Sequence, residues 1–178
     1  MALTTEAPLI GVAAALKAAS DPSFIPKATL FDEFSLPDRV AIVTGANRGL
    51  GLEMALALCE AGATVYALDL PPSPGEEFLA TAEYAKKLGS SLKYVSVDVT
   101  DQQSVWDKIA TIGDTEKRVD VCVAAAGVLG ISDCLSYKAD DFQRIMNVNV
   151  NGVLYSAQGS IILIASMSGS ITNRVGSL

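Results

Sequence analysis

The sequence contains no histidine, the side chain that most often serves as a general base or a metal ligand near neutral pH. This absence excludes Ser-His-Asp and Cys-His catalysis and any imidazole-based metal centre, and we predict no metal site. Cysteine is scarce as well: Cys59, Cys122 and Cys134 are odd in number and lack the spacing of metal ligands. We interpret them as buried thiols in a reducing compartment, which predicts a cytoplasmic protein.

Positive charge is in deficit, with 13 lysines and arginines against 20 aspartates and glutamates and a net charge of −7. An acidic chain is a poor partner for nucleic acid or for an anionic membrane surface. Long hydrophobic runs are missing too. The apolar stretch at residues 9–16 is too short to span a bilayer and follows no basic segment, so we expect no signal peptide. Half of the residues are nevertheless hydrophobic, which is typical of a sheet covered on both faces.

Two regions differ in composition. Residues 1–36 combine a short alanine-rich helix with a proline-interrupted arm, whereas residues 37–178 have the length of one domain. In the second region, strands are expected near 39–44, 64–69, 92–98, 119–125 and 160–165, and helices near 49–61, 75–88, 101–112 and 139–157. This alternation predicts an α/β fold. We expect a Rossmann-type doubly wound parallel sheet of about five strands, with ligands bound at the carboxyl ends of the strands.

A glycine-rich turn follows the first predicted strand. Residues 40–51 read Val-Ala-Ile-Val-Thr-Gly-Ala-Asn-Arg-Gly-Leu-Gly, and a helix-forming run continues to Gly62. Glycines there would let a phosphate approach the backbone, and the N–H groups and positive dipole end of the helix would face it. The turn therefore predicts dinucleotide binding by Thr44, Gly45, Asn47, Arg48, Gly49, Leu50 and Gly51. An ordinary strand–turn–helix is the alternative.

Two acidic residues follow the second and third predicted strands. Asp69 stands 24 residues after Gly45, close to the spacing of roughly 20 at which a carboxylate meets the ribose hydroxyls of a dinucleotide. A carboxylate there repels a 2′-phosphate and so favours NAD over NADP, whereas Arg48 could pair with that phosphate or remain a solvated turn residue. Asp98 could accept a hydrogen bond from the adenine amino group, or it could be the N-cap of the helix that begins near Gln102.

Together these motifs resemble the short-chain dehydrogenase/reductase family over about residues 36–172, and most closely its fungal polyol and sugar-alcohol dehydrogenases. The resemblance implies that Asp98 and Val99 contact the adenine. Ala124-Ala125-Ala126-Gly127 occupies the place of the family's Asn-Asn-Ala-Gly segment. Ala125, Ala126 and Gly127 are therefore expected to border the cofactor, although both asparagines are replaced.

The resemblance also supplies two candidate catalytic residues. Asn149-Val150-Asn151-Gly152 matches the family's Asn-x-x-Gly helix motif, which makes Asn149 the candidate for the asparagine that holds an active-site water. The strand-like run that ends at Ser166 resembles the one that delivers the catalytic serine, with Ser168 as an alternative. Without the resemblance, Asn149 would be interpreted as a polar core residue of a helix and Ser166 as a turn residue.

The family implies hydride transfer between a nicotinamide dinucleotide and a small secondary alcohol or ketone, by a homo-oligomeric full-length protein. Its Tyr-x-x-x-Lys pair does not occur after Ser166, and the link at Gln158-Gly159 is shorter than the family's. We therefore expect the chain to be truncated before this motif. Two alternatives remain open: a cofactor-binding protein without catalytic activity, and an S-adenosylmethionine-dependent methyltransferase. The spacing of the glycine turn and the downstream asparagine and serine argue against the second.

Overall fold

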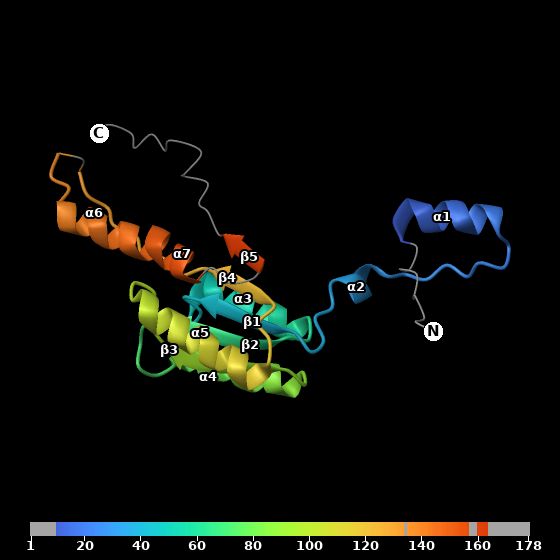
Figure 1. Ribbon diagram of the computed structural model, residues 1–178, viewed down its shortest axis with the longest axis horizontal. Coiled ribbons are helices and arrows are strands. Elements are labelled where there is room, and N and C mark those ends of the chain that lie inside the picture. The colour runs from blue at the N-terminus through green and yellow to red at the C-terminus, as the bar shows by residue number, and fades with distance from the viewer. Residues whose placement is uncertain (1–9, 134, 157–159, 164–178) are drawn as a thin grey trace. The chain divides into compact units, whose positions relative to one another are not determined.

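The computed structural model describes residues 10–133, 135–156 and 160–163 (Figure 1). The chain forms two compact units, one ending at Ser35 and the other beginning at Leu36. The first unit contains helices α1 (Gly11–Ser20) and α2 (Leu30–Glu33). α1 is rich in alanine, and none of its residues is buried.

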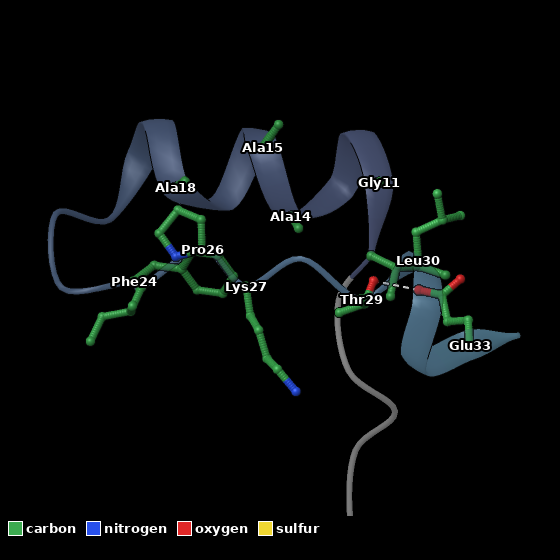
Figure 2. Close-up of a pocket in the computed structure, with 12 residues that line it drawn as sticks. Gly11, Ala14, Ala15, Ala18, Phe24, Pro26, Lys27, Thr29, Leu30 and Glu33 are labelled. Atoms are coloured by element: carbon green, nitrogen blue, oxygen red, sulfur yellow. Dashed lines mark hydrogen bonds between the residues drawn. The ribbon is translucent and has the colours of Figure 1, made fainter. Parts of the chain in front are cut away.

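The first unit contains a cavity of about 940 Å³, which small and apolar side chains line for the most part (Figure 2). Its polar side chains already have partners. Lys27 lies 2.7 Å from a carboxylate oxygen of Asp32, and the Thr29 hydroxyl donates to Glu33. The cavity therefore offers few free polar groups to a ligand.

A parallel sheet in the order β3-β2-β1-β4-β5 forms the centre of the second unit. Its strands are β1 (Val40–Thr44), β2 (Thr64–Asp69), β3 (Ser91–Ser96), β4 (Val121–Ala124) and β5 (Ser160–Leu163). The strand order reverses between β1 and β4, so that the chain winds outward from β1 in both directions. The predicted α/β class and doubly wound parallel sheet are confirmed.

Helices cover both faces of this sheet, as Figure 1 shows. They are α3 (Gly49–Glu60) and α4 (Glu76–Lys87) on one face, and α5 (Gln102–Glu116) and α7 (Gly152–Ser156) on the other. Successive β1 residues alternate between the two cores, with Ala41 and Val43 in the first and Val40 and Ile42 in the second. This alternation explains why β1 is apolar from Val40 to Val43: each of its faces is buried.

Each core also holds one cysteine. Cys59 lies in the core under α3 and Cys122 in the core under α5, and both thiols are buried and free. Burial raises the pKa of the Cys59 thiol, and it raises the pKa of Cys122 to about 11. Both thiols are therefore neutral and unreactive near pH 7. The third cysteine, Cys134, lies outside the described residues.

α5 is a full turn longer than the sequence predicts. The predicted end near residue 112 is followed by Gly113, a typical stop residue, yet the helix continues to Glu116. The last turn is fastened to the sheet, because Lys93 of β3 lies 2.7 Å from the Glu116 carboxylate and the Tyr66 hydroxyl of β2 also donates to it. The helix ends where Lys117 adopts a left-handed conformation, with φ of 63°.

The helix predicted over 139–157 is present as three consecutive segments. They are α6 (Ala139–Met146), the π-helical turn η1 (Asn147–Asn151) and α7. A π-helical turn inserts an extra residue into the helix and shifts the side chains that follow it. In the parts of the chain that the structure describes, no helix is both long and apolar enough to cross a membrane.

At the amino end of the sheet, one carboxylate links the starts of β1 and β4 by hydrogen bonds. Asp120, just before β4, accepts hydrogen bonds from the Val40 N–H at 2.9 Å, from Arg39 at 3.0 Å, and from two Arg118 nitrogens at 2.7 and 2.6 Å. Its own N–H donates to the Val40 carbonyl at 2.8 Å. The Arg118 guanidinium, with help from the Val40 N–H and Arg39, holds the pKa of the Asp120 carboxyl far below its usual range.

We expect replacement of Asp120 by asparagine to lower the free energy of unfolding at pH 7 by about 1–3 kcal/mol, the value of charged hydrogen bonds. Because the folded-state pKa is depressed, this stabilisation is complete above the unfolded pKa near 3.9 and declines as pH falls toward the folded value. Urea titrations of both proteins between pH 7 and pH 2 should show the difference shrinking below about pH 4.

Asp114→Asn, which removes an exposed carboxylate from α5, provides the matched control and should change stability little at any pH. A stability difference for Asp120→Asn that stays constant from pH 7 to pH 2 would contradict the assignment of this role to the ionised carboxylate.

Candidate functional site

A cleft of about 510 Å³ lies at the carboxyl ends of the strands in the second unit. All of the predicted cofactor residues line it except Thr44 and Gly49. The lining residues are Gly45, Asn47, Arg48, Leu50, Gly51, Asp69, Leu70, Pro71, Val97, Asp98, Val99, Ala125, Ala126, Gly127, Val128 and Val148. The glycine turn, the two acids and the segment after β4 are therefore brought together in one place, where the topology of the sheet predicts a binding site.

Two glycines of the turn are required by the packing of the chain itself. Gly45 has φ of +68°, and a Cβ there would lie 2.6 Å from the Cα of Ala126. A Cβ on Gly51 would lie 2.2 Å from the carbonyl oxygen of Gly45. Gly45 and Gly51 therefore let three backbone segments touch, a packing reason that the sequence does not reveal, and the approach of a phosphate to the turn stays a prediction.

Gly49 differs from these two glycines. It has φ of +60°, which side chains rarely adopt, but its Cβ position has no atom within 4 Å. It is the first residue of α3, and Arg48 at the N-cap position contributes no capping hydrogen bond from its side chain. The turn thus presents an open face of backbone at the positive end of a helix, as a pyrophosphate would require.

Thr44 supports the turn from beneath. Its side chain is buried, and its hydroxyl oxygen accepts a hydrogen bond from the Ala126 N–H at 3.1 Å. The Gly45 N–H donates to the Leu68 carbonyl at 2.7 Å. These contacts tie the turn to the ends of β4 and β2, so Thr44 supports the cleft without lining it.

Asp69 is held in place by two backbone donors. One carboxylate oxygen accepts from the Asn47 N–H at 2.9 Å, and the other accepts from the Leu70 N–H at 2.8 Å. Each oxygen keeps a second acceptor position, so the carboxylate can still receive two hydroxyl donors from the cleft. Arg48 is exposed, and within the described residues it forms no ion pair.

Asp98 does not cap the following helix, so that alternative prediction is wrong. The N-cap of α5 is Asp101, whose carboxylate accepts from the Ser104 N–H at 3.1 Å. Asp98 instead accepts from the N–H and the hydroxyl of Thr100, at 2.9 and 2.8 Å. Asp98 lines the cleft, and because both of these bonds go to one carboxylate oxygen, the other can still accept a hydrogen bond.

Asn149 braces the wall of the cleft with both ends of its side-chain amide. Its Oδ1 accepts from the Val128 N–H at 2.9 Å, and its Nδ2 donates to the Val128 carbonyl at 3.0 Å. The residue lies in the π-helical turn η1, which the helical periodicity of the sequence does not reveal. Its predicted role of holding an active-site water stays a prediction. Ser166 and Ser168 lie outside the described residues.

Sequence reasoning missed the cleft residues Leu70, Pro71, Val97, Val128 and Val148. Leu70 and Pro71 belong to the segment that directly follows Asp69, and the Tyr94 hydroxyl donates to the Pro71 carbonyl at 2.7 Å. Burial, with the Asp69 charge adding to it, raises the pKa of Tyr94, so the hydroxyl keeps the proton that it donates. The run of prolines after Asp69 was the available signal. In the described parts of the chain, no cluster of His, Cys, Asp or Glu could hold a metal ion.

Comparisons with known proteins agree with this geometry. The family described as short chain dehydrogenase matches residues 39–178. The short chain dehydrogenase/reductase notP′ of Aspergillus versicolor is 32% identical over 163 residues, which cover 84% of this chain and 56% of that protein. The NADP-dependent mannitol dehydrogenase of Hypocrea jecorina is 30% identical over 166 residues, or 85% of this chain and 62% of that protein.

The fold is also found in solved structures. Carveol dehydrogenase from Mycobacterium avium in complex with NAD superposes with a TM-score of 0.68 at 26% identity, covering 77% of this chain and 57% of that one. The chain spans about half the length of the curated relatives that it matches. On the match over residues 39–178 and on these relatives, the chain belongs to the short chain dehydrogenase family.

Proposed function

We propose that this chain binds NAD(H) in the cleft described above. We further propose that the full protein oxidises a secondary alcohol, or reduces the matching ketone, of a polyol or sugar. The observation that carries the proposal is the position of Asp69, whose carboxylate the Asn47 N–H holds against the glycine turn at 2.9 Å. Family membership does not support the methyltransferase alternative.

The residues of the cleft fit a nicotinamide dinucleotide. Arg48, Leu50 and Gly51 line the cleft at the start of α3, where a phosphate would approach, and Asp69 retains free acceptor positions for two ribose hydroxyls. Val97 and Val99 offer apolar surface to a purine, with the Asp98 carboxylate between them as an acceptor for its amino group. When bound, the nicotinamide would accept or donate the hydride.

Charge supports NAD over NADP. A 2′-phosphate beside Asp69 would bring two like charges together, whereas a 2′-hydroxyl would donate to the same carboxylate. The exposed Arg48 is the opposing group, since a guanidinium could pair with the phosphate. The names of similar proteins include both cofactors, NADP for the mannitol dehydrogenase and NAD for the carveol dehydrogenase structure. The Asp69 carboxylate supports NAD because it is fixed by two backbone donors, whereas Arg48 has no ion-pair partner among the described residues to hold it toward the ribose.

The proposed catalytic roles belong to Asn149 and Ser166. Asn149 keeps the Val128 backbone in place and so shapes the wall on which a substrate would lie. Ser166 would donate a hydrogen bond to the substrate oxygen, which lowers the barrier by stabilising the charge that develops there. A polyol or sugar is the proposed substrate because the mannitol dehydrogenase is among the relatives at 30% identity or more.

The cofactor preference can be measured directly. We expect NADH to bind this chain about 5- to 150-fold more tightly than NADPH, because a misplaced charged contact costs roughly 1–3 kcal/mol. Asp69→Asn removes the charge while keeping the shape of the side chain. It should lower the ratio of the NADPH to the NADH dissociation constant. Asp114→Asn, the same change outside the cleft, should leave the ratio unaltered. Equal or tighter binding of NADPH in a fluorescence titration of the unmodified chain would overturn the choice of NAD.

The place of the pyrophosphate can be tested with two matched glycines. Gly49 and Gly89 have φ of +60° and +81°, and at both an added Cβ meets no atom within 4 Å. Alanine at either position should cost a similar strain of about 1–2 kcal/mol in stability. Only Gly49→Ala should also weaken NADH binding, by about tenfold or more, because the strain at Gly49 would displace the neighbouring Arg48 and Leu50, which line the cleft at the start of α3.

Thermal melts and NADH titrations of both variants provide the comparison. Equal binding by Gly49→Ala and Gly89→Ala would place the phosphate away from the start of α3.

A further inference from the structure

The glycine turn predicts that Asn47 binds a dinucleotide, but its side-chain amide bonds to another part of the chain. Its Oδ1 accepts a hydrogen bond from the Gly75 N–H at 2.8 Å, while its backbone N–H donates to Asp69 at 2.9 Å. One residue of the glycine turn thus holds both ends of the segment 69–75, which connects β2 to α4. Nothing in the spacing of the glycines points to Gly75.

The segment 70–75 has very few free backbone donors. Its sequence is Leu-Pro-Pro-Ser-Pro-Gly, and the three prolines have no N–H. The Leu70 N–H is already given to Asp69 at 2.8 Å, and the Gly75 N–H is given to Asn47 at 2.8 Å. Only the Ser73 N–H remains, so this wall can offer almost no backbone hydrogen bond to an additional phosphate.

The same segment is also fastened at its middle. The Tyr94 hydroxyl donates to the Pro71 carbonyl at 2.7 Å, and the Tyr94 ring packs edge-to-face on Phe78 of α4 with the ring centroids 5.2 Å apart. Leu70 and Pro71 line the cleft beside Asp69. The shape of the cleft at Asp69 therefore depends on anchors at Asn47 and at Tyr94.

We propose that Asn47 is a positioning residue that makes the site select an unphosphorylated adenosine ribose. Its amide oxygen closes segment 70–75 against the glycine turn and occupies the Gly75 N–H, which removes both the space and a donor that a 2′-phosphate would use. The Asp69 carboxylate supplies repulsion, and the closed segment denies the phosphate an alternative position. This inference rests on the proposed function, since it concerns the selectivity of the same site.

Asn47→Ala is the first test. Alanine keeps the backbone N–H that holds Asp69 and removes only the amide, so the variant isolates the anchor at Gly75. We expect the ratio of the NADPH to the NADH dissociation constant to fall by about 2- to 12-fold, the equivalent of one hydrogen bond. Asn47→Asp retains an oxygen acceptor for the Gly75 N–H and should keep the ratio at or above the original value.

Tyr94→Phe is the second test, and it releases the same segment from its other anchor without touching the glycine turn. It should lower the ratio in the same direction, and it keeps the proposal falsifiable if Asn47→Ala fails to fold. Ser90→Ala is the matched control. It removes a 2.6 Å hydrogen bond from a side chain to the Ala63 carbonyl outside the cleft, so it should reduce stability without changing the ratio.

The outcomes separate the two proposals. If the unmodified chain binds neither NADH nor NADPH, the proposed function fails and the role of Asn47 fails with it. If both dinucleotides bind and neither Asn47→Ala nor Tyr94→Phe changes the ratio, cofactor binding stands and the positioning role of Asn47 is overturned. A ratio that falls equally in Ser90→Ala would also overturn it, because loss of stability alone would then explain the effect.

Discussion

The second unit depends on a contact between backbone segments that leaves no space for a side chain. The turn after β1 lies so close to Ala126 that Gly45 cannot carry a Cβ, and the first turn of α3 lies equally close to Gly45. Thr44 adds a hydrogen bond to the same place. Because the turn is fixed by the chain itself, the backbone that faces the cleft is ordered before any ligand arrives, and binding does not have to meet that entropic cost.

Hydrogen bonds within the chain also orient the two carboxylates of the cleft. Asp69 accepts hydrogen bonds from the Leu70 N–H of its own loop and from the Asn47 N–H of the glycine turn, and Asp98 accepts from Thr100 of its own loop. These bonds orient each carboxylate without the help of a positively charged neighbour. A dinucleotide would therefore meet two acids on its adenosine side. Its pyrophosphate would have to be balanced by the start of α3 and by Arg48. This separation of acidic side chains from the helix start suits a ligand that carries its hydroxyl groups at one end and its phosphate groups at the other.

The sequence predicted the centre of the sheet well because β1 is buried on both faces and β2 is buried over residues 65–68, so both strands form apolar runs. It predicted Asp69 because strand length and helix length set a nearly constant spacing from the glycine turn. It failed where the decisive partner lies far away in the chain. The last turn of α5 persists past Gly113 because β2 and β3 hold Glu116, and local propensity contains no trace of that contact.

The candidate site shows the same limit. Asp98 and Asp101 are equally good N-cap residues by composition, and only the path of the chain after β3 assigns the cap to Asp101. The amide of Asn47 is committed to Gly75, 28 residues away, and the amide of Asn149 to Val128, 21 residues away. An asparagine can bond to almost any backbone group, so its identity alone predicts a polar contact but not its partner.

The two hydrogen bonds between Asn149 and Val128 make the continuous helix of α6, η1 and α7 a part of the cleft. One turn further along, Gly152 approaches Val99 so closely that an added Cβ would lie 3.0 Å from that side chain. The helix therefore touches the loop after β4 on one side and the loop after β3 on the other. A shift of this helix along its axis would therefore displace the Val128 wall and the Val99 wall of the cleft together. The width of the cleft thus depends on the position of the helix, so a substitution on the helix that touches no ligand can still change ligand affinity.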